Sequence, residues 1–134
     1  MVVIDTNLLV RLAANDNPVE RAVVADFLGR EQCRVSKTVL LETEWVLRSR
    51  YGYSSRQFAD FADYLLALSS LIIEDERVVR WAVDAARGGI DFADSLHLAV
   101  AAAAEEPFYT FDKKLQRKAS RLKDVTVRLL GAKR

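Results

Sequence analysis

Four acidic side chains of this chain adjoin apolar segments, where an unpaired charge is costly. They are Asp5, Glu42, Asp94 and Asp112. A carboxylate in apolar surroundings either takes up a proton or finds a cation. Four such carboxylates within 134 residues indicate a shared cation, and so they predict a metal site.

Glu42 carries the strongest of these signals. On a helix, the residues three and four positions away from it have no positive charge: Thr38, Val39, Trp45 and Val46. Glu44 differs, because Arg48 lies four positions further on, where helical side chains meet. We therefore expect Glu44 to be a surface acid paired with Arg48. For Glu42 we expect a metal-binding or catalytic role, with a tertiary salt bridge as the alternative.

The other acids also fit ordinary positions at helix starts. Asp5 and Asp112 can each begin a helix, where the helix dipole favours a negative charge. Asp91 and Asp94 have the spacing of an N-cap and a third helical residue, and both can accept backbone N–H groups there. We expect Asp91 to be the cap and Asp94 to be the ligand.

The ligand types indicate which metal the site would hold. A set of carboxylate oxygens suits hard cations such as Mg²⁺ or Mn²⁺. The chain has one Cys and one His, which argues against a zinc site of the usual kind. His97 lies one turn beyond Asp94 and could touch the site, although a packing histidine is the more ordinary interpretation. Cys33 is expected to be a buried strand residue, and a single cysteine fits the reducing cytoplasm.

The apolar pattern places these acids on alternating strands and helices. We expect short, continuously apolar strands at 1–5, 33–36, 71–73, 108–111 and 125–129. The expected helices follow cap and stop signals and cover 6–12, 18–28, 36–50, 54–68, 75–87, 92–104 and 112–122. Thr6 is the expected cap of the first helix, and Gly29 the expected end of the second. This order predicts an α/β fold with a parallel sheet covered by helices, in which sites form at the carboxyl ends of strands.

Composition favours one soluble domain over residues 1–134 without a signal peptide, located in the cytoplasm. Hydrophobic residues make up 51% of the chain, and the net charge is +1. The charge is uneven, because nine Lys or Arg residues and one acid lie between positions 113 and 134. This basic segment is either an RNA-binding surface or a solvated helix face. Its first candidates for RNA binding are Lys113, Lys114, Arg117 and Lys118.

The ordered motifs resemble the PIN-domain ribonucleases, and most closely the VapC-type toxins of toxin–antitoxin modules. The resemblance covers essentially the whole chain and rests on four segments: Asp5-Thr6-Asn7, the helix around Glu42, Asp91-Phe92-Ala93-Asp94-Ser95-Leu96-His97, and Thr110-Phe111-Asp112.

This resemblance implies a three-layer fold in which a short central parallel sheet is flanked by helices, and it implies a homodimer. It also implies an endoribonuclease that depends on Mg²⁺ or Mn²⁺ and is inhibited by a VapB-like antitoxin. Asp5, Glu42, Asp94 and Asp112 match the acidic catalytic and metal-binding positions of the family. The positions matching supporting residues are Thr6, Thr110 and, less uniformly within the family, Asp91.

Two other functions remain open. One is a Mg²⁺-dependent phospho-accepting receiver domain. Such a domain needs an acid at the end of a central strand, and Glu74-Asp75-Glu76 at the end of the third strand could imitate it. The other is a PIN-like binding module without catalysis. The helices at 37–50 and 54–68 carry apolar residues on more than one face, which predicts an antitoxin-binding groove formed by Trp45, Phe58 and Phe61; a dimer contact is the alternative.

Overall fold

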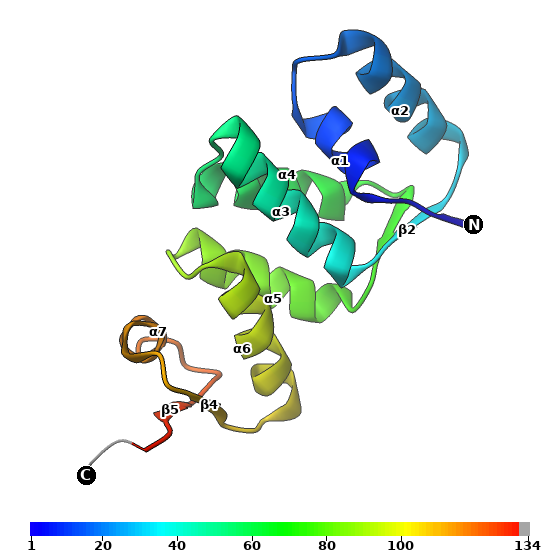
Figure 1. The fold of residues 1–134 in the computed structure, drawn as a ribbon. Coiled ribbons are helices and arrows are strands. Elements are labelled where there is room, and N and C mark those ends of the chain that lie inside the picture. Colours follow the sequence, from blue (N-terminus) through cyan, green and yellow to red (C-terminus); the bar gives the residue numbers. More distant parts are fainter. Residues whose placement is uncertain (132–134) are drawn as a thin grey trace. The chain divides into compact units, whose positions relative to one another are not determined.

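A computed structural model describes residues 1–131 of the chain. The chain divides into two compact units, Met1–Glu76 and Arg77–Arg134, and each is described on its own. Figure 1 labels elements of both units, although β1 and β3 carry no label there. Lys133 and Arg134, which belong to the basic segment, lie outside the described residues. That residues 1–134 act as one domain stays a prediction.

The first unit is built on a three-stranded parallel sheet. Its strands have the order β1-β2-β3, and Cys33 pairs in register with Val2 on one side and Leu71 on the other. The strands are β1 (Val2–Val3), β2 (Cys33–Val35) and β3 (Leu71–Ile73). The helices that flank them are α1 (Thr6–Ala13), α2 (Pro18–Arg30), α3 (Lys37–Tyr51) and α4 (Ser55–Ala67). The expectation of an α/β fold with a parallel sheet flanked by helices is confirmed.

Local capping explains where these helices begin. The side chain of Ser36 accepts the backbone N–H of Val39 at the start of α3. Ser54 and Gln57 form a reciprocal capping box at α4. Such caps satisfy N–H groups that have no partner inside a helix. Gly52 ends α3 in the left-handed conformation, with φ of 69°, which glycine adopts without steric cost.

One expected helix end in this unit is wrong. Gly29 lies inside α2, which continues to Arg30. Gly29 has no left-handed backbone angle, so it does not form the conformation that would end the helix. Cys33 is fully buried in β2, as expected.

The second unit packs three helices and a two-stranded sheet around its own core. Its elements are α5 (Glu76–Arg87), which starts at the unit boundary, α6 (Phe92–Ala104), β4 (Phe108–Thr110), α7 (Lys113–Ala119) and β5 (Val127–Leu129). β4 and β5 pair in parallel. The buried core consists of Ala85, Ile90, Leu98, Ala101, Leu115, Ala119 and Val125. The five expected strands are therefore all present, in two sheets, one in each unit.

The expected bounds in this unit hold for α6 and are too long elsewhere. α6 covers residues 92–104, as its cap at Asp91 and its alanine-rich sequence predict. α7 ends at Ala119, earlier than expected. Among the described residues, no helix has the length and apolar character needed to cross a membrane.

Candidate functional site

Asp5 occupies the junction between β1 and α1. Its backbone is extended, and its Oδ1 accepts the backbone N–H of Asn7 at 3.2 Å, so Asp5 is the N-cap of α1. The expectation that Thr6 is the cap is wrong, because Thr6 is the first helical residue. A cap uses one of the two carboxylate oxygens, and the side chain of Asp5 is exposed.

The hydroxyl of Thr6 joins this junction to α3. Thr6 is 7% exposed, and its Oγ1 donates a hydrogen bond to Oε1 of Glu42 at 2.5 Å. Because Thr6 is buried and Glu42 is exposed, this bond holds the Glu42 carboxylate near the end of β1. The structure thus brings together Thr6 and Glu42, two residues that the sequence assigns to one site.

Glu42 and Glu44 have exchanged the environments expected for them. Glu42 is exposed, so its apolar neighbours in sequence do not bury it. Glu44 is 7% exposed and therefore not a surface acid, although its expected pairing is confirmed: Nε of Arg48 donates to its Oε2 at 2.8 Å. The physical reason is helical periodicity, since Glu44 lies between Leu40 and Leu47 on the buried face of α3.

Asp94 lies in the first turn of α6 with a second acid at the cap. Oδ2 of Asp91 accepts the backbone N–H of Asp94 at 3.2 Å, which confirms Asp91 as the cap. Burial raises the pKa of Asp94 above its ordinary value, and the negative charges of Asp91 and Asp112 raise it further. The charges of His97 and Lys118 oppose this shift. The carboxylates of Asp91 and Asp112 are therefore close enough to Asp94 to disfavour its charged form.

Asp112 caps α7 at the end of β4. Its Oδ1 accepts the backbone N–H of Leu115 at 3.0 Å. The backbone N–H of Asp112 donates to Oγ1 of Thr110 at 3.0 Å. Thr110 thus fixes the backbone that carries Asp112, and its supporting role in the site stays a prediction.

Two basic residues, one in α7 and one just after it, bind the turn that precedes Asp91. Nζ of Lys118 donates to the carbonyl of Gly89 at 3.1 Å, and Nη2 of Arg121 donates to the carbonyl of Gly88 at 2.9 Å. Gly89 is left-handed, with φ of 109°. Sequence reasoning missed this clamp: Gly88-Gly89 signals a helix end, but nothing local says what binds its carbonyls.

Lys118 therefore has a structural task that was not expected from the basic segment. The other three candidates for RNA binding, Lys113, Lys114 and Arg117, are exposed on α7. RNA binding by these residues stays a prediction, and Lys118 is the least available of the four because its Nζ is already bonded to Gly89.

The acids that would serve a receiver domain are used for structure. Oε1 of Glu74 accepts the backbone N–H of Lys37 at 2.8 Å, and Asp75 binds the Nζ of Lys37. These contacts fasten the start of α3 to the end of β3. The receiver interpretation loses the residues on which it rested.

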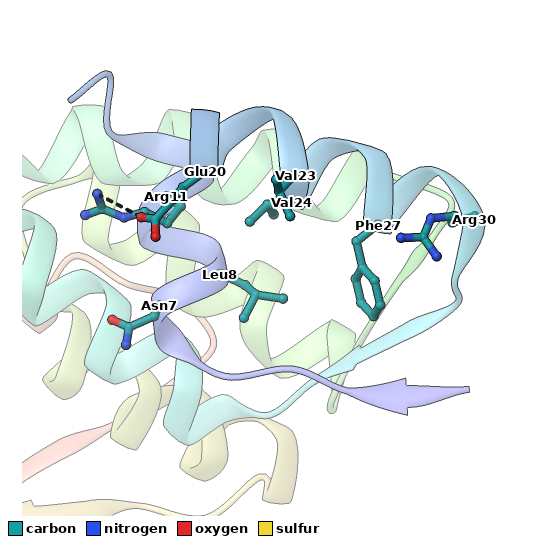
Figure 2. Close-up of a pocket in the computed structure, with 8 residues that line it drawn as sticks. All are labelled: Asn7, Leu8, Arg11, Glu20, Val23, Val24, Phe27 and Arg30. Atoms are coloured by element: carbon teal, nitrogen blue, oxygen red, sulfur yellow. Dashed lines mark ion pairs between the residues drawn. The ribbon is translucent and has the colours of Figure 1, made fainter. Parts of the chain in front are cut away.

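An apolar groove lies between α1 and α2 (Figure 2). It has a volume of about 750 Å³. Apolar side chains line its middle, while Arg11 and Glu20 lie at one end and Arg30 at the other, as Figure 2 shows. Its lining residues are Asn7, Leu8, Arg11, Glu20, Val23, Val24, Phe27 and Arg30.

The groove expected on α3 and α4 is partly wrong. Phe58 is only 2% exposed and belongs to the core, because it lies on the same face of α4 as the buried Ala62 and Leu65. Trp45 is 53% exposed, and half-buried Phe61 stacks on Tyr64 with ring centroids 6.2 Å apart.

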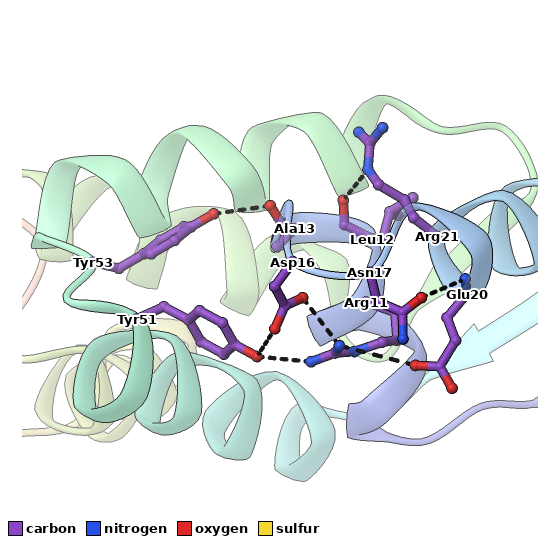
Figure 3. A network of polar contacts seen from close by, with 9 residues as sticks. All are labelled: Arg11, Leu12, Ala13, Asp16, Asn17, Glu20, Arg21, Tyr51 and Tyr53. Carbon is purple, nitrogen blue, oxygen red and sulfur yellow. Dashed lines mark hydrogen bonds and ion pairs between the residues drawn. The ribbon is translucent and has the colours of Figure 1, made fainter.

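A polar network that sequence reasoning missed fixes the loop between α1 and α2 (Figure 3). Nη1 of Arg11 binds Asp16 at 3.0 Å, its Nη2 donates to the hydroxyl of Tyr51 at 2.7 Å, and that hydroxyl donates to Asp16 at 2.8 Å. Tyr53 donates to the carbonyl of Ala13 at 3.2 Å. The network ties α1, one wall of the groove, to the end of α3.

Metal ligands were expected from both units, with Asp5 and Glu42 in the first and Asp94 and Asp112 in the second. Within either unit, the described residues gather no three His, Cys, Asp or Glu side chains closely enough to hold an ion. The four-acid metal site therefore stays a prediction.

Comparisons with known proteins point to a family. A solved structure similar to this chain is that of the Mycobacterium tuberculosis VapC20 toxin, described as cleaving the Sarcin-Ricin loop. The identity is 19%, the TM-score is 0.44, and the match covers 94% of this chain and 99% of that one. No curated protein matches the sequence. Residues 2–121 match the PIN domain, which is most of the chain. The chain belongs to the PIN domain family.

Proposed function

We propose that this protein is a metal-dependent endoribonuclease that hydrolyses RNA phosphodiester bonds. PIN domains are typically nucleases, and the family match covers residues 2–121. The observation that carries the proposal is the grouping of carboxylates around Asp94: Asp91 caps the turn that carries it, and the charges of Asp91 and Asp112 act on it and, together with burial, raise its pKa. Acids that repel one another at a helix start are stabilised by a cation.

The residues fit a hard divalent cation. Asp5, Glu42, Asp94 and Asp112 offer only carboxylate oxygens, which Mg²⁺ and Mn²⁺ prefer, and these four would hold the ion. When bound, such an ion supplies a water of lowered pKa and neutralises charge on the phosphate oxygens. No side-chain nucleophile is then needed.

The chain's own residues would orient this set. Thr6 fixes the carboxylate of Glu42 by a direct hydrogen bond. Asp91 fixes the first turn of α6, which carries Asp94, and Thr110 fixes the backbone of Asp112. Partners that orient ligands in this way strongly affect metal affinity and activity. Exposed basic side chains of α7 would hold the RNA through its phosphates.

The test is a cleavage assay on a mixture of structured and single-stranded RNA. We expect cleavage with Mg²⁺ or Mn²⁺, none with excess EDTA, and recovery when metal is added back. Asp94→Asn should remove the activity. RNA binding without cleavage under every metal condition would instead support a PIN-like binding module without catalysis, and full activity in EDTA would contradict the metal role.

We further propose that this nuclease is the toxin of a toxin–antitoxin pair and a homodimer. The α1–α2 groove is open, apolar along its middle and charged at its ends, which suits an amphipathic segment of a VapB-like antitoxin. Trp45 and Phe61 are left as candidates for the antitoxin or dimer contact. The product of a small adjacent open reading frame should bind the protein and stop cleavage. Mass measurement in solution tests the dimer.

A further inference from the structure

A smaller pocket also lies within the second unit. It has a volume of about 310 Å³ and lies between α6 and the segment that leads into β4. Its lining residues are His97, Val100, Ala101, Glu106, Pro107 and Phe108. None of them has a role in the proposed chemistry, so the pocket requires a separate explanation.

Two aromatic rings form part of the pocket wall. The rings of His97 and Phe108 are stacked, with centroids 6.4 Å apart and an angle of 11° between their planes. His97 is exposed, and Val100 is 56% exposed. The rings thus support each other in one orientation beside an accessible apolar surface, which suits a flat, unstacked ligand.

The position of His97 ties this pocket to the acids. It lies three residues after Asp94 on α6, which places it on the same side of the helix and about 4.5 Å further along the axis. The charge of His97 acts on the Asp94 carboxylate, where it opposes the rise in pKa. A strand of RNA whose phosphate lies at Asp94 would therefore have an adjoining nucleotide within reach of the pocket.

The charge in the pocket selects the part of the nucleotide that enters. Glu106 is an acid in the lining, and a carboxylate repels a phosphate but accepts hydrogen bonds from the amino edge of a base. Guanine offers two neighbouring donors to such a carboxylate. Uracil offers one N–H between two carbonyl oxygens, which the carboxylate repels.

We propose that this pocket binds an amino-bearing nucleobase, guanine above all, next to the phosphodiester that is cleaved. This proposal rests on the proposed ribonuclease function and adds a specificity site to it. His97 supplies the stacking surface, held by Phe108, and Glu106 reads the edge of the base.

The experiment uses the full chain carrying Asp94→Asn, so that RNA stays intact. Three probes are compared: oligouridylate, the same strand with one guanosine, and the same strand with one 2-aminopurine. The fluorescence of 2-aminopurine falls when the base stacks on an aromatic ring. We expect tighter binding of the guanosine probe than of oligouridylate, and quenching of 2-aminopurine. His97→Ala should weaken guanosine binding by at least about fivefold, the lower end for one stacked base, and abolish quenching, while His97→Phe should restore both.

Matched variants separate the pocket from general surface effects. Tyr109→Ala removes an aromatic side chain that is also exposed on β4 but does not line the pocket, and it should leave binding unchanged. Glu106→Gln should reduce the preference for guanosine over uridine, whereas Glu105→Gln should not. Equal binding of the two probes, or equal effects of His97→Ala and Tyr109→Ala, would overturn the proposal.

The two proposals fail in different ways. If wild-type protein cleaves RNA with metal but His97→Ala has the same cleavage sites and rate, the pocket proposal is wrong and the ribonuclease function stands. If the guanosine preference and the quenching are present but no metal supports cleavage, the protein binds RNA and the ribonuclease function is wrong.

Discussion

The hydroxyl of Thr6 donates to Oε1 of Glu42 at 2.5 Å, across 36 positions of sequence. This bond joins the residue after Asp5 to the exposed Glu42 of α3, and Asp5 and Glu42 are two of the four acids that the sequence predicts as metal ligands. Glu42 has freedom to turn because it is exposed, so a single buried donor largely determines where its carboxylate lies.

Thr6→Val should therefore reduce cleavage without unfolding the protein. Valine has nearly the shape of threonine, and exposed Glu42 can take water as a partner in place of the lost hydroxyl. Loss of a residue that orients a metal ligand reduces activity or metal affinity by roughly 10- to 100-fold. Cleavage rates over a range of Mn²⁺ concentrations measure the effect.

Thr43→Val is the matched control for this change. Thr43 lies on α3 and is buried, as Thr6 is on α1, but its hydroxyl donates to the carbonyl of Val39 within the same helix. Cleavage by this variant should equal that of wild type. Equal losses in both variants would mean that the Thr6–Glu42 bond has no particular part in the site.

Asp94→Asn should abolish cleavage and leave the metal-free protein equally stable or more stable. The folded state raises the pKa of Asp94, so keeping this group ionised at neutral pH reduces the free energy of unfolding. Asparagine removes that charge, and the cap made by Asp91 does not use the Asp94 side chain. Thermal unfolding with chelator compares the two proteins.

The pH dependence of this difference has a definite sign. As the pH falls through the raised folded-state pKa, Asp94 takes up a proton and the cost of its charge disappears. The advantage of the variant should therefore be largest at neutral pH and vanish below the ordinary value of about 3.8. If the metal-free Asp94→Asn variant is instead clearly less stable than metal-free wild type at neutral pH, the charged side chain of Asp94 stabilises the fold.

Two acids on α3 should respond in opposite ways to the same chemical change. Glu44→Gln weakens a partly buried charge-assisted contact with Arg48, and it should cost about 1 kcal/mol of unfolding free energy while metal-dependent cleavage persists. Glu42→Gln should abolish cleavage with little change in stability, since the amide oxygen can still accept from Thr6. Urea unfolding and cleavage assays on both variants give the comparison. The reverse pattern would move the catalytic role to Glu44.

The sequence predicts most elements of the fold because their signals are local. The capping box at Ser54 and the cap at Asp91 depend on residues three positions apart, and the short apolar strands depend on a few consecutive residues. The environments of Glu42 and Glu44 depend on which face of α3 meets the core. The spacing of Leu40 and Leu47 indicates that the buried face includes Glu44. The apolar residues on both sides of Glu42 make this face difficult to recognise in the sequence.

Other features of the candidate site depend on approaches between distant segments. The clamp of Lys118 on Gly89 spans 29 positions, and the bond of Tyr51 to Asp16 spans 35. No local propensity encodes these contacts, because they require that the helices already be packed. The assignment of Phe58 to a surface groove is wrong for the same reason: an aromatic residue on an amphipathic helix is ambiguous until its partners are known.

Val23→Glu should weaken antitoxin binding while leaving cleavage intact. Val23 is 64% exposed and lines the α1–α2 groove, where a charge would oppose the entry of an apolar side chain. Val19→Glu is the control, since Val19 is 75% exposed on the same helix and does not line the groove. Binding to the product of the adjacent open reading frame is measured for each. Equal affinities in both variants would place the antitoxin on another surface.

Lys113→Gln with Lys114→Gln should reduce the salt dependence of RNA binding, whereas Lys118→Gln should not. Each exposed lysine that neutralises a phosphate contributes roughly 0.7 to the slope of log K against log salt on a single strand. The double change should therefore lower that slope by about 1.4.

Lys118 is the matched control. It is bound to the carbonyl of Gly89, so its loss should instead lower thermal stability. Titrations of oligouridylate at several salt concentrations, all in the Asp94→Asn background, measure the slopes. If neither change alters the slope, the basic face of α7 is a solvated surface, and RNA is held elsewhere on the protein.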